Sequence, residues 1–397
     1  MPNNNMRKKI ALIGNMNNGH YTLMRYLSDH SFDITLLLFN NEISHFYPDS
    51  DTYANDRFDK IKKLDWGAPE LLKYTHRNKI IDDLKSYDFL IGNGYTPAYL
   101  AKASIKLDMF DPYGSDLYEA TIYGLKRFLI QNNVLTFYQR KGIYESKYIH
   151  LPKTNPIYDI RVEKLSPTSE KISCFKPEIY LPEYLESNVS FKNYTNQNIE
   201  KLIKLKKNNF IYFSQSRHYW KGKSKKNPNN KGSDKLIYAW KKFISEHRPN
   251  AILVLFEYGN DFLESKKLIK DLNLDETIIW MPLSPRKEIM KMIYHVDVVM
   301  GEFFHSWFTG GLSMEAISMG KPLITYRDES YISKFYKDIY PILNAYTIDE
   351  IYNKIVFSYQ NKNKILKIGD LAKKWYIENV INSFINTYQK IINKNLF

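Results

Sequence analysis

The chain has 397 residues, of which 44% are hydrophobic and 25% are charged, a composition typical of soluble globular proteins with hydrophobic cores. Because this length exceeds one ordinary domain, two domains are expected. The formal net charge of +14 indicates an acidic partner and leaves three classes open: nucleic acid, an anionic membrane face and a phosphorylated substrate.

The single cysteine, Cys174, cannot form an internal disulfide, and no cysteine and histidine cluster has the spacing of a zinc site. The polar segment Met1–Lys9 leads directly into Ile10–Ile13, an apolar run too short for a signal peptide. No stretch approaches the ~20 apolar residues that span a membrane. We therefore expect a cytoplasmic protein without a structural metal.

The first half of the sequence alternates between apolar runs and helical patterns. Ile10–Ile13 predicts a strand, Gly14–Gly19 a tight polar loop and Tyr21–Ser28 a helix. Two further apolar runs, Ile34–Phe39 and Tyr87–Ile91, predict strands. Continuous apolar strands that alternate with helices are typical of a parallel sheet covered on both faces.

The same alternation starts again after an interdomain linker, which we place near Phe175–Glu186 because prolines interrupt the pattern there. Strands are expected at Phe210–Phe213, Ala251–Phe256, Thr277–Trp280, Val296–Met300 and Pro322–Tyr326. Helices are expected at Asp234–Glu246, Leu263–Leu272, Pro285–Tyr294 and Leu312–Met319.

These patterns predict the α/β fold class, with two Rossmann-like domains over residues 1–180 and 181–370. Apolar residues at helical spacing over Ile368–Ile392 predict a long terminal helix, assigned to a third segment, 371–397. We expect this helix to pack back toward the N-terminal domain. Two such domains facing a cleft would bind ligands at the carboxyl ends of their strands.

The block from Gly310 to Tyr326 has the features of a nucleotide site. Gly310 and Gly311 open a helix, where backbone N–H groups and the positive end of the helix dipole bind phosphate. Glu315 lies about one turn further along this helix, where a carboxylate can accept hydrogen bonds from both hydroxyls of a ribose. The alternative is that Glu315 is a solvated helix residue and the glycines only form a turn.

This block resembles the family 4 glycosyltransferases and their GT-B relatives. The family pattern Gly-x4-Glu-Ala-x3-Gly-x-Pro is matched by Gly310, Glu315, Ala316, Gly320 and Pro322. The resemblance implies a retaining, metal-independent transfer, with Glu315 on the ribose and Gly310, Gly311 and Leu312 at the donor. The family's first Glu would fall at Trp307, so its role is either lost or taken by Glu302 or His305.

A second element of resemblance follows the strand at Phe210–Phe213. Ser214-Gln-Ser-Arg217 and Lys231-Gly-Ser-Asp-Lys-Leu-Ile237 are similar to the family's Gly-Arg-Leu…Lys-Gly-x-Asp-x-Leu-Ile element, whose Arg and Lys bind the diphosphate. Two fixed cations can neutralise a leaving diphosphate without a metal. Arg217 and Lys231 are therefore catalytic candidates, and Ser214 is a further donor contact. The alternative is a basic surface loop, which we favour for the lysines of the insertion Trp220–Asn230.

Two loops of the N-terminal half are candidates for the acceptor side. Asp111-Pro-Tyr-Gly-Ser-Asp116 is similar to the family's His-Gly-Ser-Asp loop, with Tyr113 at the histidine position, followed by Gly114 and Ser115. Asp116 has a second, compatible interpretation as the cap of a helix that begins at Leu117.

The other loop, Gly14 to His20, lacks the Gly-x-Gly-x-x-Gly spacing of a dinucleotide site. In the resembling family this loop faces the donor phosphates and the acceptor, which makes Gly14 and Gly19 donor candidates and Asn18 an acceptor-side candidate. A lone histidine such as His20 is more often a local hydrogen-bonding residue than a catalyst.

The sequence thus favours a hexosyltransferase-like enzyme that moves a sugar from a nucleotide-sugar to a hydroxyl of a glycan or lipid-linked acceptor, in bacterial surface polysaccharide or glycoconjugate assembly. No cofactor is expected. The alternatives are a sugar-nucleotide epimerase or phosphorylase of the same fold and, without any supporting motif, a nucleic-acid-binding protein. Attachment to the anionic inner face of the membrane explains the basic surplus better, given the lysine-rich segments 201–207 and 221–235.

Overall fold

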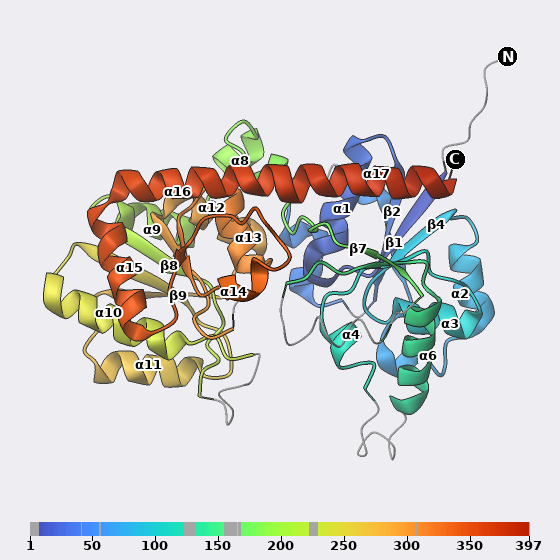
Figure 1. Cartoon of the computed structure of the whole chain (residues 1–397), viewed down its shortest axis with the longest axis horizontal. Coiled ribbons are helices and arrows are strands. Elements are labelled where there is room, and N and C mark those ends of the chain that lie inside the picture. The colour runs from blue at the N-terminus through green and yellow to red at the C-terminus, as the bar shows by residue number, and fades with distance from the viewer. Residues whose placement is uncertain are drawn as a thin grey trace. The chain divides into compact units, whose positions relative to one another are not determined.

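The computed structural model describes residues 8–396 except 41, 55–56, 123–131, 155–164, 166–167, 222–228 and 306–307. The chain forms two compact units, each with its own sheet (Figure 1). Unit 1 consists of Met1–Tyr180 and Asn379–Phe397, and unit 2 consists of Leu181–Glu378. The predicted α/β class with two Rossmann-like domains is confirmed.

Unit 1 is built on a parallel sheet whose described strands number seven, in the order β3-β2-β1-β4-β5-β6-β7. The central strand β1 pairs with β2 on one side and with β4 on the other, so the chain crosses the sheet after β3. This is a doubly wound topology, in which ligands bind at the carboxyl ends of the strands. The strands are β1 (Lys9–Ile13), β2 (Asp33–Phe39), β3 (Ile61–Leu64), β4 (Phe89–Gly92), β5 (Met109–Phe110), β6 (Tyr148–His150) and β7 (Glu170–Ile172).

Apolar side chains fill both faces of this sheet. Ala11 and Ile13 of β1 belong to one core cluster, and Ile10 and Leu12 belong to the cluster on the opposite face, as the two-residue period of a strand requires. The helices of unit 1 are α1 (Gly19–Asp29), α2 (Arg77–Leu84), α3 (Thr96–Ala103), α4 (Ser115–Tyr118), α6 (Asn132–Glu145) and α17 (Ser383–Leu396).

Unit 2 repeats the topology with six described strands, in the order β10-β9-β8-β11-β12-β13. Its first strand is again central, since β8 pairs with both β9 and β11. The strands are β8 (Phe210–Ser214), β9 (Ala251–Phe256), β10 (Ile278–Met281), β11 (Val298–Met300), β12 (Leu323–Thr325) and β13 (Leu343–Asn344). The helices are α8 (Val189–Asn193), α9 (Gln197–Lys206), α10 (Ser233–His247), α11 (Phe262–Asp271), α12 (Arg286–His295), α13 (Gly311–Ser318), α14 (Glu329–Ile332), α15 (Ile348–Gln360) and α16 (Lys362–Trp375).

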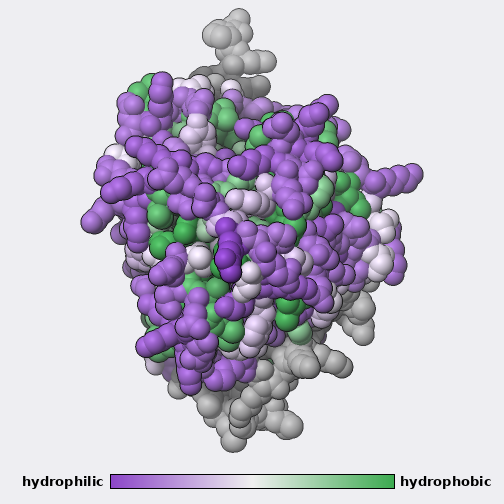
Figure 2. All heavy atoms as spheres, turned by 90° about the vertical axis from the view of Figure 1, so that its left-hand side faces the viewer, coloured by the Kyte–Doolittle hydropathy of each residue, from purple (hydrophilic) through white to green (hydrophobic). Residues whose placement is uncertain are grey.

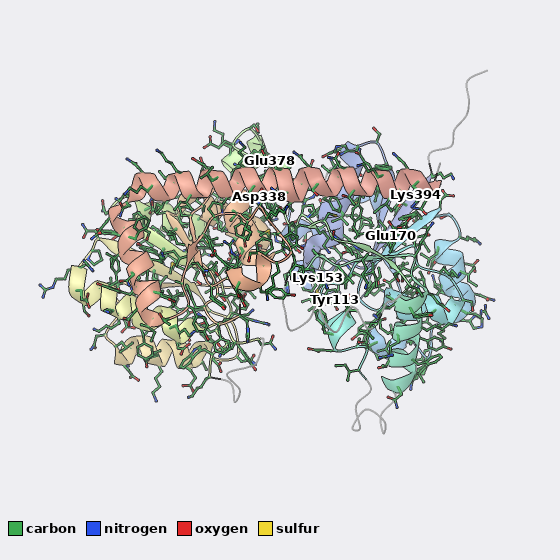
Figure 3. The ribbon with its side chains drawn as sticks, viewed as in Figure 1. Tyr113, Lys153, Glu170, Asp338, Glu378 and Lys394 are labelled. Carbon is green, nitrogen blue, oxygen red and sulfur yellow. The ribbon has the colours of Figure 1, made fainter. Side chains whose placement is uncertain are left out.

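The C-terminal helix starts at Lys362, six residues before the apolar spacing predicts, and continues through a π-helical segment, Tyr376–Asn382, into α17. In unit 1, Phe384, Tyr388 and Ile392 of α17 are fully buried in the core, which confirms the predicted return to the N-terminal domain. Lys394 of α17 also lies 3.9 Å from Glu170 of β7; both residues are labelled in Figure 3. None of the helices in the described parts of the chain is long and apolar enough to cross a membrane.

Candidate functional site

The candidate donor site lies at the carboxyl edge of the unit 2 sheet. Because the strands of this sheet are parallel, the loops that follow β8, β9, β10 and β11 all emerge at this edge. The N-terminus of α13, which follows β11, lies there as well. The predicted donor residues Ser214, Arg217, Lys231, Glu302, His305, Gly310, Gly311, Leu312 and Glu315 stand on these loops and on α13.

The N-terminus of α13 presents backbone rather than side chains. Gly310 is the N-cap residue, and no side chain caps the helix. A Cβ atom added to Gly311, the first helical residue, would meet no heavy atom within 4 Å. The first N–H groups of a helix lack an intrahelical partner and carry the positive end of its dipole, so this end suits an anion.

Glu315 is buried on α13, with only 6% of its surface exposed. One carboxylate oxygen, Oε1, accepts a hydrogen bond of 3.0 Å from Nε of Arg286, the first residue of α12, and the other accepts from Nε2 of Gln215. The side chains of Arg286 and Glu315 are 13% and 9% exposed. The alternative interpretation of Glu315 as a solvated helix residue is therefore wrong.

Lys231 and Glu302 form a second, largely buried ion pair. Lys231 Nζ lies 2.8 Å from Glu302 Oε2, and the two side chains are 8% and 20% exposed. The backbone of Lys231 is also fixed, because its carbonyl accepts from Phe303 N at 2.9 Å. Glu302 follows β11, and its N–H donates to Thr325 Oγ1 at 3.1 Å. The structure thus places one cation and one carboxylate side by side at the end of β11.

His305 lies near this pair. Burial, followed by the positive charge of Lys231, lowers the pKa of His305 below its usual 6.5, so the imidazole is neutral at pH 7. Its Nε2 atom is buried and has no hydrogen-bond partner among the residues that the structure describes. Trp307, where the resembling family has its first Glu, lies outside the described residues.

Arg217 is exposed, and its guanidinium donates to Asn229 Oδ1 at 2.8 Å. The loop that carries it is joined to the loop after β9, since His218 N donates to the carbonyl of Tyr258 at 2.9 Å. Gly259 permits this contact: its φ is +107°, and a Cβ there would come within 2.5 Å of the His218 nitrogen. Most of the insertion Trp220–Asn230, residues 222–228, lies outside the described part.

The charges of Arg217, Glu302 and Glu315 all act on Tyr258, which follows β9. Burial raises the pKa of its phenol to about 12, the positive charge of Arg217 opposes that shift, and the negative charges of Glu302 and Glu315 reinforce it. The charges of Arg217, Glu302 and Glu315 are therefore near enough to Tyr258 to affect the titration of its phenol. The loops after β8, β9 and β11 and helix α13 therefore contribute charged groups around a single side chain.

Among the described residues, Gln215 Oε1, Ser216 Oγ, His218 Nε2 and His305 Nε2 are buried polar atoms without a hydrogen-bond partner. Buried polar groups in native proteins are almost always hydrogen-bonded. Their concentration at the ends of β8 and β11 fits a site that a polar ligand completes. Within the described ranges, no group of three or more His, Cys, Asp or Glu side chains is arranged to hold a metal ion.

The predicted residues of unit 1 also gather at the carboxyl edge of their sheet. Gly14 follows β1 with a φ of +79°, and a Cβ there would come within 2.3 Å of Asn93 Oδ1. The side chain of Asn18 is buried and bonded within the loop, to Asn15 and to the carbonyl of His45. Gly19 begins α1.

The loop after β5 is organised by Asp116. Its carboxylate accepts hydrogen bonds from the backbone N–H groups of Gly94, Tyr113 and Gly114, at 3.0, 3.2 and 2.9 Å. The helix starts at Ser115 with Gly114 as its N-cap residue, so the interpretation of Asp116 as the cap of a helix from Leu117 is wrong. Burial raises the pKa of Asp116 to about 7. Tyr113 lies beside α4 (Figure 3).

His20 and Asp111 form a buried network between these two loops. His20 Nδ1 lies 2.8 Å from the Gly14 carbonyl, and its Nε2 lies 3.2 Å from Asp111 Oδ2. The same oxygen is 2.9 Å from Lys176 Nζ. Burial opposes ionisation of Asp111, but Lys176 and the hydrogen bonds from His150 and His20 hold the pKa of Asp111 well below 3.8. The expectation that His20 is a local hydrogen-bonding residue agrees with these contacts.

No protein-family model matches the chain, and no curated protein matches its sequence. Solved structures do match over nearly the whole length. HepE from Anabaena, in complex with UDP and glucose, is 14% identical and aligns over 98% of this chain and 100% of its own, with a TM-score of 0.61. Sucrose-phosphate synthase from Thermosynechococcus elongatus aligns over 98% and 99%, at 11% identity and a TM-score of 0.63. The chain has the GT-B fold.

The fold is shared by enzymes of another kind. UDP-GlcNAc 2-epimerase from Neisseria meningitidis, bound to UDP-GlcNAc, is 12% identical and aligns over 96% of this chain and 100% of its own, with a TM-score of 0.58. At such identities the likeness concerns the fold, and the activity has to be argued from the site.

Sequence reasoning missed three residues of the unit 2 site: Gln215, Tyr258 and Arg286. Gln215 and Tyr258 stand in the loops after β8 and β9, and Arg286 is the first residue of α12, which follows β10. That position is a usable signal, because the carboxyl ends of parallel strands meet at one edge. Tyr258 and Arg286 had no counterpart in the motifs, and only the pairing of the strands places them beside Glu315.

Proposed function

We propose that the chain is a glycosyltransferase that moves a sugar from a nucleotide-sugar to a hydroxyl of a glycan or lipid-linked acceptor. The observation that carries this proposal is the set of groups at the carboxyl edge of unit 2: the buried Glu315 held by Arg286 and Gln215, the Lys231–Glu302 ion pair, and the N-terminus of α13, which no side chain caps. A second support is the fold, which HepE shares in complex with UDP-glucose at 15% identity and a TM-score of 0.61.

The residues divide into two roles. The Glu315 carboxylate suits a ribose, because two hydroxyl groups can donate to its two oxygens. The N–H groups at Gly310 and Gly311 suit the diphosphate, and Lys231 and Arg217 supply positive charge on the same side. This division reproduces what the family resemblance implies and adds Gln215 and Arg286, which hold Glu315 in place.

In the transfer, the bond between the anomeric carbon and the diphosphate oxygen breaks, and the electron pair leaves with the nucleoside diphosphate. The acceptor oxygen bonds to the anomeric carbon, and its proton passes to the leaving phosphate. Arg217, Lys231 and the N-terminus of α13 stabilise the charge that develops on that phosphate, which is the main electrostatic contribution without a metal ion. We propose retention of the anomeric configuration, in keeping with the resemblance.

Replacement of Arg217 by alanine tests the assignment. Loss of one charge-stabilising group at a transition state lowers turnover on the order of 10²–10³-fold. Release of nucleoside diphosphate from a panel of nucleotide-sugars provides the assay. Lys221→Ala is the matched control, since Lys221 is 57% exposed, pairs with Glu264 and stands four residues away. Near-normal turnover of Arg217→Ala, or an equal loss in the control, would contradict the proposed role.

The epimerase is the second candidate, because the fold is shared with a UDP-GlcNAc 2-epimerase. Incubation of the enzyme with the donor alone separates the two activities. Slow hydrolysis that releases nucleoside diphosphate supports the transferase. An epimerised nucleotide-sugar with no hydrolysis identifies an epimerase instead.

A lipid-linked acceptor would bring the enzyme to the inner face of the membrane, and we include peripheral attachment there in the proposal. The net charge of +14 supports attraction to an anionic leaflet. The donor is best identified by thermal shift with a panel of nucleotide-sugars and free nucleotides. A ligand that binds only the folded state raises the melting temperature, and the increase grows with the ratio of its concentration to its Kd.

A further inference from the structure

The C-terminal end of α9 and the N-terminal end of α16, two lysine-rich helices of unit 2, lie close together. The ammonium groups of Lys206 on α9 and Lys362 on α16 both lie over the ring of Phe210, at 5.7 and 5.2 Å from its centre. With the C-cap residue Lys207, the two helices contain nine lysines and only two carboxylates, Glu200 and Asp370. Their net charge of +7 is half of the charge of the whole chain.

The outward side of these helices is basic and apolar at once. Lys201, Lys204 and Lys207 are exposed near α9, and Lys362, Lys364, Lys367 and Lys374 are exposed on α16. Between the lysines of α16 stand Leu366 and Leu371, which are 52% and 58% exposed. Figure 2 looks onto the end of unit 2 where α16 begins, and shows mostly hydrophilic side chains with hydrophobic ones scattered between them.

The charges of this surface, which we call the α9–α16 face, are largely uncompensated. Asp297 pairs with Lys206, and Glu378 lies 4.0 Å from Lys374. At the edge of the face, burial lowers the pKa of Lys321 to about 8; the negative charge of Asp297 opposes this shift, and the nearby Lys206 and Lys373 add smaller effects that lower it further. A crowded set of positive charges with few carboxylate partners among the described residues has a strong preference for an anionic surface.

We propose that the α9–α16 face docks on the surface of an anionic phospholipid membrane. Lysines attract the negative surface of such a leaflet, and exposed leucines between them gain free energy by entering the boundary of the acyl chains. A nucleic acid would satisfy the lysines but would offer nothing to Leu366 and Leu371, so the mixed character of the face favours lipid. The α9–α16 face is the surface through which we expect the peripheral membrane attachment that is part of the proposed function. None of the residues of this face belongs to the donor site.

Vesicle flotation of the full chain tests the proposal. We expect binding to mixed vesicles of phosphatidylcholine and phosphatidylglycerol, and little to phosphatidylcholine alone. The triple variant Lys364→Glu, Lys367→Glu and Lys374→Glu should bind the mixed vesicles on the order of 100-fold more weakly, because each lysine near the surface contributes about a factor of 5–10. Leu366→Ser with Leu371→Ser should weaken binding as well, and should do so even at low salt.

The matched control reverses the charge of three exposed lysines of unit 2 that lie outside the face, by the replacements Lys267→Glu, Lys270→Glu and Lys334→Glu. It changes the net charge equally and should bind vesicles within about 10-fold of the unmodified chain. An equal loss in this control, or no binding of the unmodified chain to anionic vesicles, overturns the proposal. So does duplex DNA binding that the α9–α16 variant abolishes while the leucine variant retains it. Donor hydrolysis, measured on each variant, reports separately on the proposed catalytic function.

Discussion

Replacement of Gly311 should leave the stability of the fold intact and weaken binding of the nucleotide-sugar donor. The change is Gly311→Ala. A Cβ atom at this position meets no heavy atom of the described residues within 4 Å, and the residue begins α13 without a positive φ. The added methyl group therefore causes no clash in the ligand-free protein. It does stand beside the N–H groups to which we assign the diphosphate.

The two expected effects differ in size. Glycine is less favourable than alanine in a helix by roughly 1 kcal/mol. Gly311→Ala should therefore leave the free energy of unfolding unchanged or raise it slightly. A methyl group that prevents a phosphate oxygen from reaching a backbone N–H removes a charge-assisted hydrogen bond of about 1.5–3 kcal/mol. That loss corresponds to a Kd for the nucleoside diphosphate that is about 10–150-fold higher.

Calorimetric titration with the nucleotide that the thermal-shift screen selects measures the affinity, and the Tm without ligand measures the fold. Gly142→Ala is the control for glycine replacement in general. A Cβ at Gly142 would come within 2.0 Å of the Pro97 carbonyl oxygen on α3, so this variant should lose about 1–3 kcal/mol of stability. If Gly311→Ala binds the nucleotide as tightly as the unmodified chain, the diphosphate does not approach the N-terminus of α13.

Three further predictions concern buried titratable groups. Burial lowers the pKa of His218 from 6.5 to about 4, so the unfolded state binds more protons between these two pH values. Stability therefore falls by up to ~3 kcal/mol as the pH falls from about 6.5 to about 4. Urea unfolding at several pH values should show a smaller dependence of stability on pH for His218→Gln. Arg286→Ala leaves Glu315 with Gln215 but without its cation, and should destabilise unit 2 by about 3 kcal/mol in the same assay, whereas Arg286→Met with Glu315→Leu should recover most of that loss. Asp116→Asn gives up one acceptor of backbone N–H groups and should lower the free energy of unfolding by about 1–3 kcal/mol; an unchanged midpoint in urea would show that the loop after β5 does not depend on this carboxylate.

Local patterns were sufficient for most of the fold. Apolar runs such as Ala251–Phe256 are recognisable because a strand buried on both faces needs no polar residue, and the structure has β9 over the same six residues. The short strands β3, β6 and β7, of three or four residues, and β5 and β13, of two residues each, were not predicted, since so few residues carry little periodicity. The terminal helix was predicted from its apolar spacing, but its first turns at Lys362 are polar on the outside and were missed.

The site divides in the same way. Gly310, Gly311 and Glu315 could be assigned from the sequence because their chemistry is local: an N-terminal helix turn and a carboxylate one turn away lie within six residues. Whether Glu315 faces solvent or the site was left open, and only the tertiary structure decided it. Burial of that side chain depends on Gln215 and Arg286, which are 100 and 29 residues away.

The sequence by itself determined that the chain contains two doubly wound domains, that helix α13 begins with glycines, and that lysines exceed carboxylates. The tertiary structure decided which side chains meet. Parallel strand pairing brings Tyr258, Arg286 and Glu302 to one edge, and Phe210 brings Lys206 of α9 and Lys362 of α16 close together. The physical reason is that backbone propensity and hydrophobic period act over a few residues, whereas charge pairing and burial depend on distances in space that a linear pattern does not contain.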